Sequence, residues 1–170
     1  MSATTLLGVW TLSMARSPQQ RRPDIAESHH VARHCGHQTI DRDPVTGEIR
    51  GVFPQAFELR TAKKELYLSL NWFEYFAGTL TDQYKGVVAA LRDKRTVKSN
   101  TAIARLNAGL IVQTGKVRGL ALRVRDRSSA SNPGYVGLEG MPKDNSDKRF
   151  LGLLASKCCV EVRGVKAIDS

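Results

Sequence analysis

Alternating apolar and polar residues mark short strands along much of the chain. Leu66, Leu68 and Leu70 alternate with Tyr67 and Ser69, which is the period of a strand with one buried face. The same criteria predict further strands over 29–35, 48–53, 55–61, 101–107, 120–125, 135–138 and 160–165. We expect the strands 55–61 and 66–70 to pair as a hairpin.

Apolar residues at helical spacing predict one long helix over 82–95. Thr81 is its expected N-cap, because a threonine hydroxyl can accept a hydrogen bond from the first free amides of a helix. Basic residues near the end of the segment suit the negative end of the helix dipole. The apolar stripe of this helix consists of Tyr84, Val87, Val88 and Leu91.

A second helix is predicted near the end of the chain. Asp144 or Ser146 is expected to cap it, and its apolar face runs to Cys158. Asn71 is expected to cap a short aromatic turn over 72–76, and the segment 108–114 fits either a helix or a strand. The fold class is therefore α+β: a mostly antiparallel or mixed sheet of five to six strands with two main helices packed on it.

Composition changes this picture at the N-terminus. Residues 1–26 are expected to form a flexible tail, and 27–166 a single α+β domain. The apolar stretch at 5–12 has the length of a signal core but lacks a basic segment before it, so export is the minority interpretation. The sequence has no run of apolar residues long enough for a transmembrane helix, and three cysteines make no disulfide framework, so we expect a cytoplasmic protein without a membrane partner.

The charge of the chain suggests a polyanionic partner. There are 26 lysines and arginines against 16 acids, a formal net charge of +10. Phosphates attract such a surface and release counterions on contact. Three arginines share one face of the strand at 120–125 and its extension, and a basic group follows the helix at 82–95. Three aromatic rings, among them Tyr67, could stack on bases. The candidate nucleic-acid-binding residues are Arg123, Arg125, Arg127, Arg92, Lys94, Arg95, Lys98, Trp72 and Tyr135.

All four histidines lie within the nine residues 29–37. His30 or His29 could act as acid and base beside Arg33 as an anion anchor, which suits RNA cleavage through the 2′-hydroxyl or ADP-ribosyl transfer. Strand alternation places His29 and Arg33 on one face and His30 on the other, so the stretch is not expected to act as one unit.

A metal site is the weaker hypothesis for the same stretch. Cys35 and His37 form one close pair, and Cys158 and Cys159 could supply further ligands, but the spacing matches no familiar zinc site. We therefore predict no metal and no cofactor, with zinc as a minority alternative.

The blocks HHVARHC, FELR with ELYLSLNWFEYF, and SNPGYVGLEGMP together resemble a set of short bacterial proteins without assigned function. The resemblance covers blocks between residues 29 and 160. It implies a bacterial cytosolic single domain and no particular reaction. That set is expected to have a histidine where this chain has Tyr135.

Three functions remain open from the sequence. The first is a basic nucleic-acid-binding protein that could also process RNA through the His/Arg cluster. The second is a protein-binding accessory or effector of a bacterial defence or toxin system, and the third is an ADP-ribosyltransferase-like enzyme. The sequence leaves open whether the protein is an enzyme at all.

Overall fold

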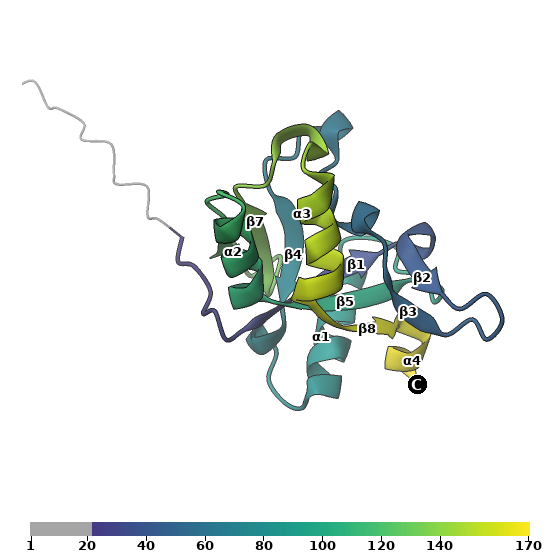
Figure 1. Cartoon of the computed structure of the whole chain (residues 1–170). Helices are drawn as coiled ribbons and strands as arrows, with labels where there is room; N and C mark the ends of the chain where they lie inside the picture. The colour runs from purple at the N-terminus through teal and green to yellow at the C-terminus, as the bar shows by residue number, and fades with distance from the viewer. Residues whose placement is uncertain (1–21) are drawn as a thin grey trace, which may run out of the picture.

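The computed structural model describes residues 22–170 and places a six-stranded antiparallel sheet at the centre of the molecule (Figure 1). The strand order is β6-β7-β4-β1-β5-β8, and a separate hairpin joins β2 and β3. The strands are β1 (His30–Cys35), β2 (Ile40–Arg42), β3 (Ile49–Val52), β4 (Leu68–Trp72), β5 (Ala102–Asn107), β6 (Arg123–Asp126), β7 (Tyr135–Glu139) and β8 (Cys159–Gly164). The helices are α1 (Leu80–Arg92), α2 (Ala108–Val117), α3 (Lys148–Leu153) and α4 (Val165–Asp169).

Both faces of the sheet carry helices. Strand alternation turns Val31 and Leu106 to one face, where they pack with α2 and α3 in the larger hydrophobic cluster. It turns Ala32 and Ile103 to the other face, where they pack with α1 and α4. Figure 1 shows α2 and α3 on one side of the strands and α1 on the other.

The second face changes character between its two halves. Its hydrophobic cluster involves β1 and β5 beneath α1 and α4. The neighbouring half, formed by β4, β7 and β6, turns polar residues to this side: Ser69, Asn71, Tyr135, Glu139, Arg123 and Arg125. The hydroxyl groups of the candidate site lie on this polar half-face.

The sequence prediction of an α+β fold with a mostly antiparallel sheet is confirmed. The strands expected at 29–35, 101–107, 135–138 and 160–165 match β1, β5, β7 and β8 closely. The ambiguous segment 108–114 begins the helix α2, whose N-cap Asn107 accepts a hydrogen bond from the Leu110 amide at 2.8 Å.

The predicted strand at 55–61 and its hairpin are wrong. Pro54–Phe57 forms a 3₁₀ turn that begins at the proline, and the chain then remains extended without a strand partner. The buried side chain of Asn145 satisfies this segment: its Oδ1 accepts from the Leu59 amide at 2.7 Å, and its Nδ2 donates to the Leu59 carbonyl at 3.0 Å. A side chain 86 residues away thus takes the place of the expected partner strand.

The helix boundaries also differ from the prediction. Thr79, not Thr81, caps α1, because Thr79 and Asp82 form a reciprocal capping box. Asp147, one residue after the predicted cap Ser146, caps α3, which continues into a π-helical turn over Leu154–Cys158. Cys159 consequently lies in β8 and not in the last helix.

Asn71 is likewise not a cap. It belongs to β4, and the aromatic 3₁₀ turn after it spans Phe73–Tyr75 without a side-chain cap.

Part of the predicted tail belongs to the sheet. The Ile25 amide donates to the Val124 carbonyl at 2.9 Å, the Asp126 amide donates to the Pro23 carbonyl at 3.0 Å, and Ile25 is buried. The rest of that prediction, residues 1–21, lies outside the described residues. Within residues 22–170, every helix is too short or too polar to cross a membrane.

Candidate functional site

The candidate site is built where β1 and β4 separate. The two strands pair at Val31 with Trp72 and at Ala32 with Asn71. Beyond this point the side chain of Arg33 takes the place of the missing strand hydrogen bonds. Its Nη1 donates to the Ser69 carbonyl at 2.9 Å, and its Nε donates to the Ala56 carbonyl at 2.7 Å.

Arg33 keeps its charge in this position. Both of its acceptors are neutral carbonyl groups, and no carboxylate in residues 22–170 lies within ion-pair distance of it. Burial lowers the pKa of Arg33, and the charges of Arg60 and Arg95 lower it further, while Cys35 and Glu65 act in the opposite direction. The three guanidinium groups therefore lie close enough to repel one another.

Arg60 joins the site from the segment before β4. Its guanidinium forms an ion pair with Glu65, and its backbone amide donates to Glu65 Oε2 at 2.8 Å. Burial raises the pKa of Glu65, but the hydrogen bonds and charge of Arg60, together with the charge of Arg33, leave it below its usual value. Glu65 thus remains ionised and neutralises one of the arginines.

Arg95 reaches the same place from the loop after α1. It forms no hydrogen bond or ion pair through its side chain with any residue from 22 to 170. Its side chain has a large exposed area, yet its guanidinium is partly withdrawn from water, and this burial, followed by the charge of Arg60, lowers the pKa of Arg95. Arg95 is accordingly an exposed cation whose charge is not neutralised by an ion pair within residues 22–170.

Three hydroxyl groups line the opposite side of the opening. The Tyr135 hydroxyl lies 3.0 Å from Ser69 Oγ and donates to the Tyr67 hydroxyl at 3.5 Å. Burial is the main cause that raises the pKa of Tyr135, so its proton is retained. The charge of Tyr135, when ionised, would raise the pKa of both Arg60 and Arg95, which places this hydroxyl near both arginines.

Gly137 of β7 has no side chain, and this lets Arg127 stack on the Tyr67 ring beside the hydroxyl groups. The guanidinium carbon of Arg127 lies 4.0 Å from the centre of the Tyr67 ring, in cation–π geometry. A Cβ on Gly137 would lie 2.7 Å from Arg127 Nε and 2.8 Å from Tyr67 Cδ2. The glycine therefore makes room for the stack.

His34 borders the site but is held neutral. Burial, then the charges of Arg95 and Arg33, lowers the pKa of His34 to about 4. Its Nε2 lies 3.1 Å from the Thr101 hydroxyl, which donates to the Lys98 carbonyl at 2.6 Å. At neutral pH His34 adds no charge and fixes the loop that carries Arg95.

We call the group Arg33, Arg60, Arg95, Glu65 and Tyr135 the arginine cluster. It holds three guanidinium groups against one carboxylate, so an excess positive charge faces a set of hydroxyl donors. Guanidinium groups donate in a planar fork that matches phosphate and carboxylate oxygens. The arrangement can bind an anion such as a phosphate, because Arg95 has no ion-pair partner among residues 22–170.

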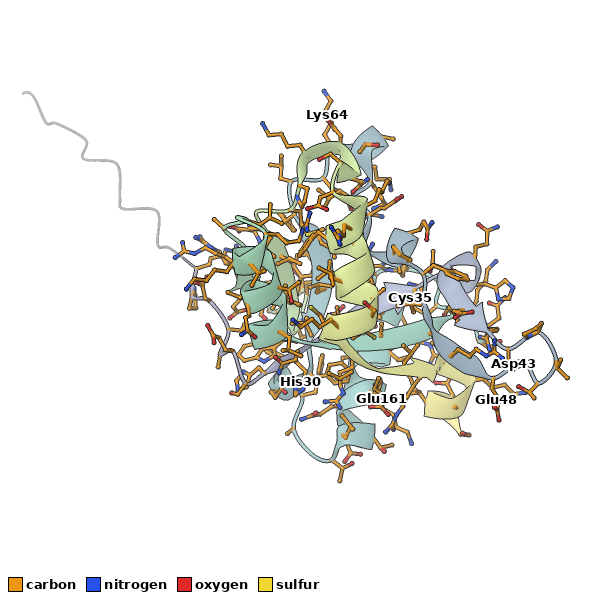
Figure 2. The ribbon with its side chains drawn as sticks, viewed as in Figure 1. His30, Cys35, Asp43, Glu48, Lys64 and Glu161 are labelled. Carbon is orange, nitrogen blue, oxygen red and sulfur yellow. The ribbon has the colours of Figure 1, made fainter. Side chains whose placement is uncertain are left out.

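The predicted catalytic residues are not brought together. His30 Nδ1 lies 2.8 Å from Glu74 Oε1, and the His30 amide donates to the same carboxylate. His29 Nδ1 accepts from Trp72 Nε1 at 3.1 Å. Arg33 lies three residues further along β1, about 10 Å away, on the other face. In Figure 2, His30 and Cys35 stand at opposite ends of β1.

The predicted arginine strip on β6 is largely neutralised. Asp24 lies 3.4 Å from Arg123 and 3.6 Å from Arg125, and Glu139 pairs with both Arg125 and Arg127. The basic group after α1 behaves differently. Arg92 pairs with Asp169, while Lys94 and Lys98 are exposed.

The cysteines do not form a metal site. Within residues 22–170 no three His, Cys, Asp or Glu side chains are placed to share an ion. Burial raises the pKa of Cys35 to about 12 and that of Cys159 to about 11, so both thiols stay protonated. Cys35 and Cys158 are buried as small apolar side chains.

Sequence reasoning found part of this site and missed the rest. Arg33, Arg95 and Tyr135 were candidates for separate roles, and the fold brings them together. Tyr67 was a candidate for base stacking. Arg60 and Glu65 were not singled out as site residues, since a single charge in a predicted connection or strand carries no signal of its own. No protein-family model, curated protein or solved structure matches the chain.

Proposed function

We propose that the protein binds single-stranded nucleic acid, with a backbone phosphate held by the arginine cluster. The observation that carries the proposal is Arg95, an exposed arginine whose side chain has no hydrogen-bond or ion-pair partner among residues 22–170 and whose charge acts on Arg33, as the charge of Arg60 acts on it. A bound phosphate would relieve the mutual repulsion of the three arginines, which is the usual reason for such a group.

Nucleic acid is favoured over a small anion by the surroundings of the cluster. The whole chain carries an excess of ten positive charges, which would attract a polyanion from a distance. Tyr67 and Tyr135 lie at the opening, with ring centres 6.4 Å apart, and hydroxyl groups there can reach sugar or phosphate oxygens. Single strands expose both their phosphates and their base faces to such a surface.

The proposed activity is binding and not cleavage. The histidine beside the cluster, His34, is neutral at physiological pH because its pKa lies near 4, so it is a poor general acid. The His30–Glu74 pair lies at the other end of β1, beside Trp72, and does not face the cluster.

The test is fluorescence anisotropy with a labelled single-stranded RNA at about 150 mM salt. Arg95→Ala should weaken binding about tenfold or more, because one charge-assisted contact to phosphate is lost. The matched control is Lys94→Ala, which removes a neighbouring exposed charge and should change the affinity little. Equal effects of the two variants, or no binding by the wild-type protein, would rule the proposal out.

A further inference from the structure

A second basic surface lies next to the arginine cluster, between the β2–β3 hairpin and α4. Two adjoining hollows of about 390 and 540 Å³ share His37 and Asn100 along their common border. Figure 1 shows the hairpin and α4 side by side at this end of the sheet. The two hollows together form a groove, which we call the hairpin groove.

The hairpin groove has an excess of positive charge. Arg42, Lys98 and Lys166 line it, together with one acidic side chain, that of Glu48, which stands near α4 in Figure 2. Neither lysine forms an ion pair with any residue from 22 to 170. The groove therefore resembles the arginine cluster in having more cations than acids.

Arg42 is held ready for an anion. Its Nη1 donates to the Gly47 carbonyl at 3.0 Å and its Nη2 to the Asn100 carbonyl at 3.4 Å, so neutral groups fix the side chain without cancelling its charge. Its Nε is buried and has no hydrogen-bond partner among the described residues. A buried donor without an acceptor is costly, so the accessible donors of Arg42 for an anion are its terminal nitrogens.

Apolar residues also line the hairpin groove. They are Ile49, Gly164 and Ala167. A groove lined by both cations and apolar residues suits a single strand, which presents both phosphates and base faces.

One loop connects the groove to the arginine cluster. Arg95 faces the cluster, and Lys98 and Asn100 line the groove. Three residues of extended chain span at most about 11 Å, so Arg95 and Lys98 are neighbours on the scale of a nucleotide strand. The hydrogen bonds from His34 through Thr101 to the Lys98 carbonyl hold the loop in place.

We propose that the hairpin groove continues the binding track of the arginine cluster. A single RNA strand with one phosphate on Arg33, Arg60 and Arg95 runs over the 96–101 loop and places its next segment between Lys98, Arg42 and Lys166. This inference rests on the proposed function and adds the path that the bound strand follows beyond the arginine cluster.

The experiment compares two labelled RNAs of about 4 and about 16 nucleotides, the span of common single-strand sites. Wild-type protein should bind the longer RNA at least about tenfold more tightly, because the groove adds a second contact to the same molecule. The double variant Lys98→Glu/Lys166→Glu should bind both lengths with nearly the same affinity. The control Lys116→Glu/Lys157→Glu changes the charge equally on exposed residues outside the groove and should keep the length dependence.

The outcomes separate the groove from the cluster. If the short RNA depends on Arg95 but length adds nothing, or if both double variants behave alike, the groove is not part of the track and the cluster proposal stands. If Arg95→Ala changes the affinity for neither the short nor the long RNA, the cluster proposal fails, and the proposed continuation into the groove fails with it. Both double variants should keep the thermal stability of the wild type, because the substituted side chains form no ion pairs in the described chain.

Discussion

An arginine that donates only to carbonyl groups is fixed in position while its charge remains available. Arg33 does this at the site, and Arg42 does it in the hairpin groove. In each case a side chain replaces hydrogen bonds that the backbone cannot make for itself. Position and charge are thereby combined in one residue, so stability and binding are both expected to depend on it.

Replacing Arg33 should therefore destabilise the fold. Arg33→Met leaves the Ala56 and Ser69 carbonyls without their donor, and each buried acceptor that loses its partner costs about 1–3 kcal/mol. Arg33→Lys should fall between wild type and Met, since an ammonium group cannot span both carbonyls as a fork does. Urea unfolding measures the effect, and Arg95→Ala is the control that should leave the midpoint unchanged. A midpoint for Arg33→Met equal to that of the wild type would contradict this role.

His34 predicts a loss of stability in acid. The pKa of His34 is about 4 in the folded protein against 6.5 ordinarily. Between these two values the unfolded chain binds a proton at His34 and the folded protein does not. The free energy of unfolding keeps its full value with respect to His34 above about pH 6.5. It falls by an amount on the order of 3 kcal/mol as the pH drops towards 4. His34→Gln should show a smaller loss between pH 7 and about pH 4.5 in urea unfolding, while His37→Gln, an exposed residue, should behave as wild type. Equal acid sensitivity of all three proteins would be evidence against the shift.

At the scale of single elements, the sequence is most informative where local rules decide the structure. β7 follows from alternation, because Val136 and Leu138 form one apolar face over a core. The segment at 55–61 has the same alternation, but Asn145 satisfies its backbone from far along the chain. No local pattern contains that information, so the strand prediction fails there.

The start of α1 offers a direct comparison of two threonines. Thr79 accepts from the Asp82 amide in a capping box, whereas Thr81 lies exposed within the helix. Thr79→Ala should lower the free energy of unfolding by about 1 kcal/mol, and Thr81→Ala should change it by a few tenths at most. Chemical denaturation of both variants decides between the two positions. A larger loss for Thr81→Ala would favour the cap that the sequence pattern suggested.

For the whole molecule, composition predicts a basic protein but does not show which of its cations are free of acidic partners. Asp24 and Glu139 neutralise much of the arginine strip on β6, although those arginines are the clearest basic pattern in the sequence. The cations that remain without acidic partners come from separate parts of the chain, among them Arg33, Arg95 and Lys98. The strand order of the sheet brings these residues to one side of the molecule. The alternation of apolar and polar residues along the sequence does not predict the strand order.

RNA binding should therefore depend on salt in a defined way. Each phosphate neutralised on a single strand contributes a slope of about −0.7 to the logarithm of affinity against the logarithm of salt concentration. One phosphate at the cluster gives an expected slope of about −0.7 for a short RNA, and Arg95→Ala should bring the slope closer to zero. Anisotropy titrations over a series of salt concentrations measure it, with Lys94→Ala as the matched control. A slope near zero would show that phosphates are not the groups recognised.

The narrow junction between β1 and β4 divides the sheet into two halves of three strands. All six residues of β1 pair with β5, but only Val31 and Ala32 pair with β4 within the described chain. The halves should separate locally before either unfolds, so amides at this seam should exchange with deuterium at a lower opening free energy than those between β1 and β5. A strand of RNA that touches Arg33 on one half and Tyr135 on the other would link them, and its binding should slow exchange at the seam above all.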